Sequence, residues 1–234
     1  MKTIMKRVIL YIIGLFLLSL GVSFSIQANL GVSPVSSLAY ALSLTAGLSI
    51  GITTILANIL FVALQVILKK RIELRELFLQ LLVALLFGFF MDATLLLVQL
   101  FPNPEILLTR FAFLVISLFI ISAGLVAYFT AKLPLMPYDA LTYVISERFD
   151  LKFSKAKITS DLLNVGIAGA VCLVFIQSLG SIGIGTILAA YYIGKILGFM
   201  MPRFKQPLHK WIYRGVKEVN HEDGVPMKPI KSKL

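Results

Sequence analysis

Long apolar runs separated by short polar or basic segments fill the chain from residue 8 to residue 201. Six runs are long enough to cross the roughly 30 Å hydrocarbon core of a bilayer as helices, at a rise of about 1.5 Å per residue. Two shorter pieces, Pro34–Ala46 and Pro137–Arg148, each begin with proline, which suits the first turn of a helix. The pattern predicts an all-α polytopic membrane protein with six transmembrane helices plus two short half-helices. The six spans are residues 8–28, 50–68, 77–100, 110–131, 157–177 and 181–201.

Composition supports a membrane protein and argues against an enzyme. Apolar residues make up 59% of the 234-residue chain and charged residues 14%, against roughly a quarter charged in soluble domains. Little sequence remains outside the lipid for a soluble catalytic domain, and the chain has no HExxH, no Walker A and no GxSxG between a strand and a helix. The single cysteine lies in an apolar run, and both histidines lie in the C-terminal tail. We therefore expect no metal site, no cofactor and no enzymatic activity.

The basic residues indicate which connections face the cytoplasm. If the two short pieces do not cross the bilayer, 20 of the 22 Lys and Arg fall on one side with both termini, Arg110 falls on the other, and Lys195 lies within a span. If both pieces crossed, the cluster at residues 69–75 and Lys132 would move to the opposite side. The positive-inside rule therefore favours six spans. It also favours a multi-pass protein of the bacterial inner membrane with both termini in the cytoplasm, and the same distribution argues against nucleic acid as a partner.

The chain contains an internal repeat at an offset of 103 residues. Residues 15–43 lie over residues 118–146 without a gap, and ten of the 29 positions are identical, including matched Gly, Pro, Tyr and Ser positions. Each copy would hold a span, a short helix and two more spans. Three crossings invert the second copy relative to the first, a construction that recurs in secondary transporters. The expected units are a first repeat at 1–103, an inverted second repeat at 104–201, and a basic cytoplasmic tail with an interfacial helix at 202–234.

Three segments carry a resemblance to a known family. They are GVSPVSSLAYALS beginning at Gly31, its partner LMPYDALTYVIS beginning at Leu135, and the glycine-rich SIGIGTILAAYYIGKILG beginning at Ser181. Together they resemble the YitT/YczE group of bacterial membrane proteins, with YczE-like sequences closest, over about residues 8–201. The resemblance implies an inner-membrane protein with several spans. It carries over no functional residue and names no solute.

Asp139, the third residue of the second short helix, is the strongest candidate for a functional group. A carboxylate near a helix N-terminus is stabilised by the helix dipole, so Asp139 could serve only to stabilise the helix. Alternatively, a short helix that begins at an irregular segment in the membrane is where transporters hold ligands, and Asp139 would then bind a cation or a proton. Its repeat mate, Ser36, keeps a hydroxyl but no charge. The substrate-binding candidates are polar side chains of the short helices and of the spans that follow them: Ser33, Ser36, Ser37, Tyr40, Tyr138, Asp139, Thr142, Tyr143, Asn58 and Asp161.

Several of these assignments have a structural alternative. Ser33 could cap the first short helix, or the free backbone N–H groups that follow Ser33 could hold an anion or a polar carbonyl group. Asn58 and Asp161 occupy matching repeat positions and could hydrogen-bond to each other or to the short helices, as part of a site or as a structural bond. Asp92 and Lys195 lie at nearly matching places in the two halves. They could form a gate, a proton relay or a structural ion pair, or Lys195 could reach the interface.

These expectations describe a secondary carrier of an unidentified small solute that works by alternating access, with proton or cation coupling at the carboxylates. Three alternatives stay open. They are a substrate-binding membrane subunit of a larger transporter, a translocator of lipid or polyprenyl phosphate, and a membrane scaffold that transports nothing. The expected partners are the lipid bilayer and the solute, and a homodimer is compatible with the sequence.

Overall fold

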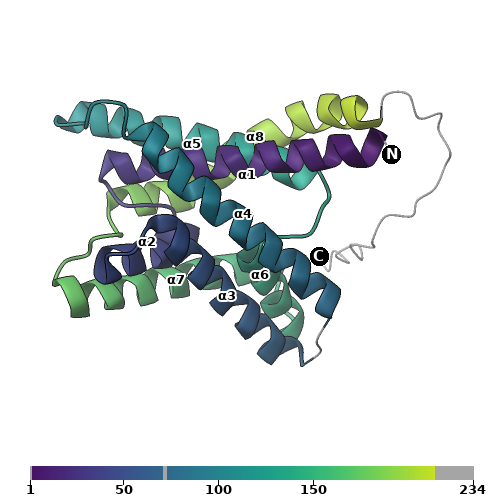
Figure 1. Ribbon diagram of the computed structural model, residues 1–234, viewed down its shortest axis with the longest axis horizontal. Coiled ribbons are helices and arrows are strands. Elements are labelled where there is room, and N and C mark those ends of the chain that lie inside the picture. The colour runs from purple at the N-terminus through teal and green to yellow at the C-terminus, as the bar shows by residue number, and fades with distance from the viewer. Residues whose placement is uncertain (1, 71–72, 214–234) are drawn as a thin grey trace.

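The computed structural model describes residues 2–70 and 73–213, and this part of the chain is all-helical with eight helices (Figure 1). The two short helices begin at Pro34 and Pro137, as the sequence predicts. In chain order the helices are α1 (Lys2–Ala28), α2 (Pro34–Ala46), α3 (Ile50–Lys69), α4 (Leu74–Val98), α5 (Leu107–Thr130), α6 (Pro137–Arg148), α7 (Phe153–Ile176) and α8 (Ile184–Tyr213).

Six of these helices, α1, α3, α4, α5, α7 and α8, are long and apolar enough to cross a membrane. They match the six predicted runs and indicate a multi-pass membrane protein. The largest difference is at α8, which continues beyond the predicted boundary at residue 201 and runs through Pro202 and Pro207 to Tyr213. The first part of the predicted tail is thus the end of α8. The remainder of the tail, residues 214–234, lies outside the described residues.

The helices form two groups, and α4 crosses between them (Figure 1). In the first group α1 packs along α5, and α8 packs on the other side of α5. In the second group α2 contacts α7 and α3, and α6 contacts α3 and α7. Helix α4 contacts both α1 and α3, so it joins the two groups.

Glycines allow the close crossing of α1 and α5. A Cβ atom on Gly14 would lie 2.7 Å from the backbone N of Tyr128, and a Cβ on Gly124 would lie 2.8 Å from the backbone N of Leu18. Small residues let helix backbones approach, and in lipid this close packing takes the place of the hydrophobic driving force that water supplies. A larger residue at either glycine would therefore push the two helices apart.

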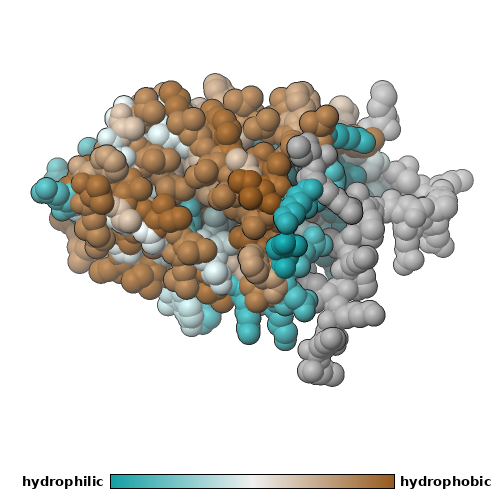
Figure 2. Space-filling view, turned by 90° about the horizontal axis from the view of Figure 1, so that it is seen from below, coloured by the Kyte–Doolittle hydropathy of each residue, from teal (hydrophilic) through white to brown (hydrophobic). Residues whose placement is uncertain are grey.

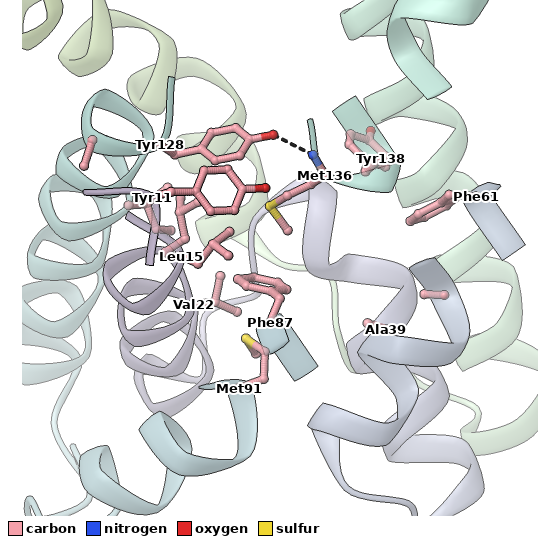
Figure 3. Close-up of a cluster of buried hydrophobic side chains, with 14 of the residues drawn as sticks. Tyr11, Leu15, Val22, Ala39, Phe61, Phe87, Met91, Tyr128, Met136 and Tyr138 are labelled. Atoms are coloured by element: carbon pink, nitrogen blue, oxygen red, sulfur yellow. Dashed lines mark hydrogen bonds between the residues drawn. The ribbon is translucent and has the colours of Figure 1, made fainter. Parts of the chain in front are cut away.

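A cluster of buried side chains fills the space between the two groups (Figure 3). The rings of Tyr11 and Tyr128 lie 5.4 Å apart, and the rings of Phe61 and Tyr138 lie 5.1 Å apart in an edge-on arrangement. Because seven helices, α1 to α6 and α8, contribute to this cluster, it fixes the position of α6 relative to α1 and α5. The members labelled in Figure 3 are Tyr11, Leu15, Val22, Ala39, Phe61, Phe87, Met91, Tyr128, Met136 and Tyr138.

The two ends of the molecule differ in polarity. At one end, which we call the basic end, α1 begins while α5 and α8 end: Lys6 donates to the carbonyl of Trp211, and Arg7 donates to the carbonyls of Ala131 and Lys132. The α1–α2, α4–α5 and α7–α8 connections lie at the opposite end, the far end (Figure 1). The surface between the ends is mostly apolar, and hydrophilic residues gather toward the basic end (Figure 2). An apolar belt with polar ends is typical of a protein surrounded by lipid.

Candidate functional site

The segment that leads into α6 is held by two tyrosines of the α1–α5 pair. Tyr11 donates from its hydroxyl to the carbonyl of Pro134 at 2.7 Å, and the backbone N–H of Met136 donates to the hydroxyl oxygen of Tyr128 at 2.6 Å (Figure 3). Met136 has the extended backbone (φ −60°, ψ 151°) that a residue before proline prefers. Pro137 then opens the helix, so the sequence and the two hydroxyls together fix where α6 begins.

Asp139 lies in the first turn of α6 and points toward the same tyrosine. The Tyr128 hydroxyl donates to Oδ2 of Asp139 at 3.3 Å while its oxygen accepts from Met136. Burial raises the pKa of Asp139, the hydrogen bond from Tyr128 and the positive charge of Lys157 act to lower it, and the negative charge of Asp161 raises it further. Burial has the largest effect, so the carboxyl is shifted toward the protonated form.

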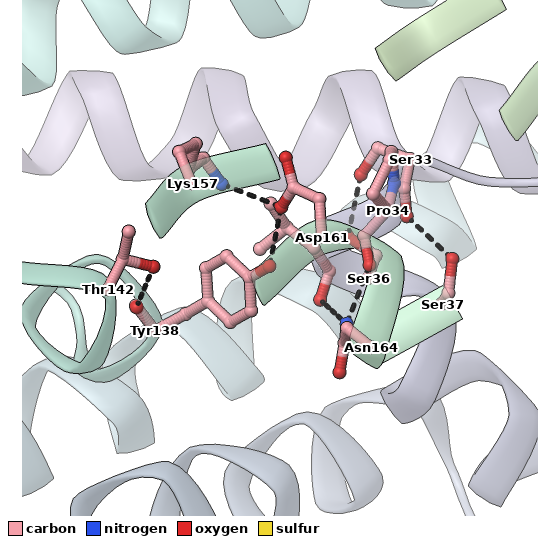
Figure 4. Close-up of polar contacts among 10 residues, drawn as sticks. Ser33, Pro34, Ser36, Ser37, Tyr138, Thr142, Lys157, Asp161 and Asn164 are labelled. Carbon is pink, nitrogen blue, oxygen red and sulfur yellow. Dashed lines mark hydrogen bonds and ion pairs between the residues drawn. The ribbon is translucent and has the colours of Figure 1, made fainter. Parts of the chain in front are cut away.

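A second polar cluster joins α6 to α7 (Figure 4). Oδ1 of Asp161 accepts a 2.5 Å hydrogen bond from the Tyr138 hydroxyl and lies 2.9 Å from Nζ of Lys157, one turn earlier on α7. The same ammonium group lies 4.4 Å from the centroid of the Tyr138 ring. The Asp161 carboxylate is therefore paired with a cation and with a hydroxyl of the short helix, so water is not its sole partner.

The start of α2 reaches α7 one turn further along (Figure 4). The buried side chain of Asn164 donates from Nδ2 to the carbonyl oxygens of Pro34 at 2.6 Å and of Val35 at 3.1 Å. Asn164 and Asp161 are three residues apart and therefore share one face of α7. The N-terminal ends of both short helices thus bind neighbouring turns of the same helix.

The three serines at the start of α2 bond mainly within their own turn. Ser33 donates to the hydroxyl oxygen of Ser36 at 3.2 Å, and Ser37 donates to the carbonyl of Ser33 at 3.0 Å. The hydroxyl of Ser33 makes no capping bond to the helix backbone. The predicted role of the Ser33 hydroxyl as a side-chain N-cap of α2 is therefore wrong.

A buried pair of glutamines connects α3, α4 and α6. Gln65 donates to the carbonyl of Pro137 at 3.0 Å and exchanges two hydrogen bonds with Gln80. Gln65 does for α6 what Asn164 does for α2, since each donates an amide N–H to the carbonyl of the proline that opens the helix. The sequence interpretation missed Gln65, Asn164 and Gln80, although a side-chain amide within an apolar span is a signal that could have identified all three.

Four predicted site residues lie away from this centre or serve their own helix. Asn58 donates to the carbonyl of Thr54 in its own helix at 2.9 Å, so the predicted bond from Asn58 to Asp161 or to a short helix is wrong. Thr142 donates to the carbonyl of Tyr138 at 3.0 Å, the common backbone contact of a helical threonine. Tyr143 is exposed, and Tyr40 packs against the apolar cluster.

The predicted ion pair between Asp92 and Lys195 is also wrong. The carboxylate of Asp92 accepts from the Ser49 hydroxyl at 2.8 Å and from the backbone N–H of Gly51 at 2.7 Å, so it binds the first turn of α3. Lys195 lies on the exposed face of α8, 2.5 Å from the Tyr191 hydroxyl and over the Tyr191 ring. A helix N-terminus satisfies the Asp92 carboxylate without a cationic partner.

An open groove of about 480 Å³ lies at the basic end, between the start of α4 and the segment before α6. Glu73, Leu74, Arg75, Glu76, Leu79 and Pro134 line it. In the part of the chain that the structure describes, no group of three or more His, Cys, Asp or Glu side chains could hold a metal ion. The chemistry available at the site is therefore that of two carboxylates, one ammonium group, tyrosine hydroxyls and amides.

Comparison with known proteins identifies the family but not the activity. Residues 5–202 match the family of unknown function DUF6198, and the chain belongs to that family. It is 30% identical over 194 residues to the uncharacterized protein YyaS of Bacillus subtilis, covering 82% of this chain and 90% of that protein. It is 24% identical over 196 residues to an uncharacterized protein of Haemophilus influenzae, covering 84% of each. No solved structure matches the chain.

Proposed function

We propose that this DUF6198 protein is a secondary carrier of a small solute, and that its site lies where the two short helices meet α7. The observation that carries the proposal is the convergence of two helix starts on one polar face: Tyr138 of α6 bonds Asp161, and Asn164 bonds the carbonyl of Pro34 in α2. Helix starts at irregular segments inside a bundle expose N–H groups and partial positive charge, and transporters use such places to hold ligands.

An inverted repeat underlies the proposed carrier, and the helix contacts support it. Exchanging the two halves turns the α2–α7 contact into α6–α3, and the α1–α4 contact into α5–α8, and all four contacts are present. The α1–α5 crossing has the same symmetry in detail. A Cβ on Gly21 would lie 3.1 Å from the carbonyl oxygen of Ser117, and a Cβ on Gly124 would lie 3.0 Å from that of Gly14. Each residue here is related to its counterpart by the offset of 103.

Proton or cation coupling follows from the charges at the site. Lys157 forms its ion pair with Asp161, and among the described residues Asp139 has a hydroxyl partner and no ion pair. A carboxylate in this position must be protonated, hydrated or paired with a cation that enters with the solute. Binding of a proton or a small cation would remove the net negative charge of the centre.

The orientation in the membrane is part of the same proposal. The basic end would face the cytoplasm, because cytoplasmic connections of inner-membrane proteins carry an excess of Lys and Arg. Both termini would then be cytoplasmic, and α2 and α6 would be half-helices that enter the membrane without crossing it. The resemblance to the YitT/YczE group is compatible with this arrangement and adds no solute.

The test combines a search for the solute with a charge-deleting variant. Purified full-length protein would be screened by thermal shift against metabolites at an acidic and a neutral pH, and hits would be followed as counterflow uptake into proteoliposomes. We expect Asp139→Asn to fold, to lose the pH dependence of binding and to reduce uptake. The matched control is Asp150→Asn, because Asp150 is exposed and has a left-handed backbone (φ 48°) that asparagine also tolerates.

Wild-type binding and uptake by Asp139→Asn, with an unchanged pH profile, would remove Asp139 from the site. If no solute is found and neither Asp139→Asn nor Asp161→Asn changes complementation in cells, a scaffold that transports nothing becomes the better account. Co-purification with an ATPase would instead support a subunit of a larger transporter.

A further inference from the structure

At the far end, the start of α8 is sealed against the α1–α2 connection by backbone contacts. Val32 donates its N–H to the carbonyl of Ser181 at 3.1 Å, and Gly185 donates to the carbonyl of Leu30 at 2.7 Å. A Cβ on Gly183 would lie only 2.3 Å from the carbonyl oxygen of Leu30. This junction, which we call the far-end seal, has no room for a side chain at its glycine positions.

The equivalent junction at the basic end is open. The repeat offset places residues 30–32 over residues 133–135. In the last helix of each half the offset is three residues longer, which places Gly88 over Gly194 and residues 73–79 over residues 179–185. Within the described chain, no backbone hydrogen bond joins these two basic-end segments as such bonds join their counterparts. Pro134, Glu73, Arg75 and Leu79 instead line the groove of about 480 Å³.

A second pair of matched contacts differs in the same sense. Near the far end α3 packs closely on α4: a Cβ on Gly51 would lie 2.3 Å from the carbonyl oxygen of Gly88, and Asp92 binds the first turn of α3. The corresponding helices α7 and α8 do not pack in this way. Ile55 of α3 packs on Gly88, but its counterpart Ile158 on α7 is 59% exposed. Among the described residues, a Cβ on Gly194, the counterpart of Gly88, would have no atom within 4 Å.

We propose that the two ends of the molecule seal alternately, and that this structure is the form sealed at the far end and open at the basic end. The inference rests on the proposed carrier function. In the second form the groove would close around Pro134, α8 would pack on α7 through Gly194, and the far-end seal and the α3–α4 contact would separate. The two forms would be related by exchange of the two halves, as the inverted repeat permits.

A polar path leads from the open groove to the proposed site. Glu76, which lines the groove, accepts a 3.3 Å hydrogen bond from Gln80, and Gln80 is paired with Gln65, which donates to Pro137 at the start of α6. Closing the groove would therefore act on groups that contact the first residue of the short helix. This connection links the state of the basic end to the geometry at Asp139.

The experiment measures access to each end in full-length protein without needing the solute. In a Cys172→Ala background, single cysteines would be placed at Ser181 in the far-end seal, at Leu79 in the groove, and at Leu100, which is 81% exposed at the end of α4, as the reference. Each would be reacted with a membrane-impermeant maleimide in vesicles opened to both sides. We expect the cysteine at residue 79 to react and the one at residue 181 to be protected.

Two glycine substitutions should affect this labelling pattern differently. Gly51→Ala disrupts the close α3–α4 contact of the present form, so labelling at residue 181 should rise about tenfold and labelling at residue 79 should fall, as a shift between two states requires. Gly194→Ala is free of clashes in the present form but would obstruct the second form. It should keep residue 79 reactive and residue 181 protected while reducing any uptake, and labelling at residue 100 should stay constant.

Parallel increases at residues 79 and 181 would indicate local loosening and would overturn the proposal, as would no change at either. A Gly194→Ala pattern like that of Gly51→Ala would overturn it too. If Gly51→Ala does not elute as a single folded species, Ser49→Ala replaces it with the same expectation, because the Ser49 hydroxyl bonds both Asp92 and the N–H of Ile52. Because the labelling experiment requires no solute, a labelling result that overturns the alternating seals would leave the Asp139 test of carrier function unaffected.

Discussion

Removing the Tyr138 hydroxyl tests whether the bond between α6 and α7 holds the site together. Tyr138→Phe deletes one oxygen and leaves the ring, which packs edge-on against Phe61 and lies under the Lys157 ammonium group at 4.4 Å. Among the described residues, the polar contact that the change removes is the 2.5 Å bond from the Tyr138 hydroxyl to Asp161. The change therefore isolates one hydrogen bond between the short helix and the span.

The expected loss in unfolding free energy is about 1 kcal/mol. Hydrogen bonds to charged groups contribute about 1.5–3 kcal/mol in soluble proteins, whereas side-chain hydrogen bonds between helices in membranes average about 0.6 kcal/mol with a maximum near 1.7. The Asp161 side chain is 23% exposed and keeps its ion pair with Lys157, so its remaining partners offset part of the loss. The expected loss of about 1 kcal/mol therefore lies within the membrane range, above its average and below its maximum.

The assay is reversible unfolding of the purified protein in bicelles, with a double-mutant cycle against Asp161→Ala. The cycle should return a coupling energy of about 1 kcal/mol, because each single change removes one partner of the same bond. Tyr192→Phe is the control, since Tyr192 lies on the exposed face of α8 with its ring edge-on to Tyr191. A Tyr138→Phe loss no larger than that control, or a coupling energy under about 0.3 kcal/mol, would show that this bond does not hold α6 on α7.

Three further changes test other parts of the argument. Gly124→Ala should lower the melting temperature, because its Cβ would meet Leu18 at 2.8 Å, whereas Gly166→Ala, with no atom within 4 Å of its Cβ, should raise it or leave it unchanged. The pKa of Asp139 is raised above its ordinary value of 3.8, so the folded state binds this proton more tightly than the unfolded state does. Protonated Asp139 should contribute its full stabilisation of the folded state below about pH 4, and this stabilisation should be lost as pH rises through the folded pKa. The melting temperature of Asp139→Asn, measured against pH, should lack that loss. A reporter that fluoresces only in the cytoplasm should give signal when fused after Asp150 and none after Asn103, and the reverse result would exclude the proposed orientation.

The helices could be predicted from the sequence because local signals specify them. An apolar run of about 20 residues has few alternatives to a helix in lipid, since every backbone group must be satisfied within the segment. The prolines at residues 34 and 137 mark the two short helices for a similarly local reason. The end of α8 was harder to predict, because Pro202 and Pro207 are common helix-ending signals and the helix nevertheless continues to Tyr213.

The partners within the site could be predicted only in part, because they depend on helix rotation. The sequence pointed to Asp161 and Tyr138, whose side chains bond each other, and also to Asn58, whose side chain bonds within its own helix. Position 61, the counterpart of Asn164, is a phenylalanine, and the amide in the first half comes from Gln65, one turn later. A glutamine side chain is one methylene longer than asparagine, so it can reach the proline carbonyl from the next turn. Matching positions alone cannot reveal such an exchange.

The uneven distribution of charge between the halves is the strongest argument that the site charges are functional. At the offset of 103, the counterparts of Asp139, Asp161 and Lys157 are Ser36, Asn58 and Thr54, none of them ionisable. In the neutral half Asn58 bonds back to Thr54, at the same spacing at which Asp161 pairs with Lys157. The first half therefore forms its short helix and following span, and packs them against the second half, without a charge at these positions. A structural role alone would not require the charges that the second half retains in a setting where each is costly, so a ligand, a cation or a proton is the better reason for them.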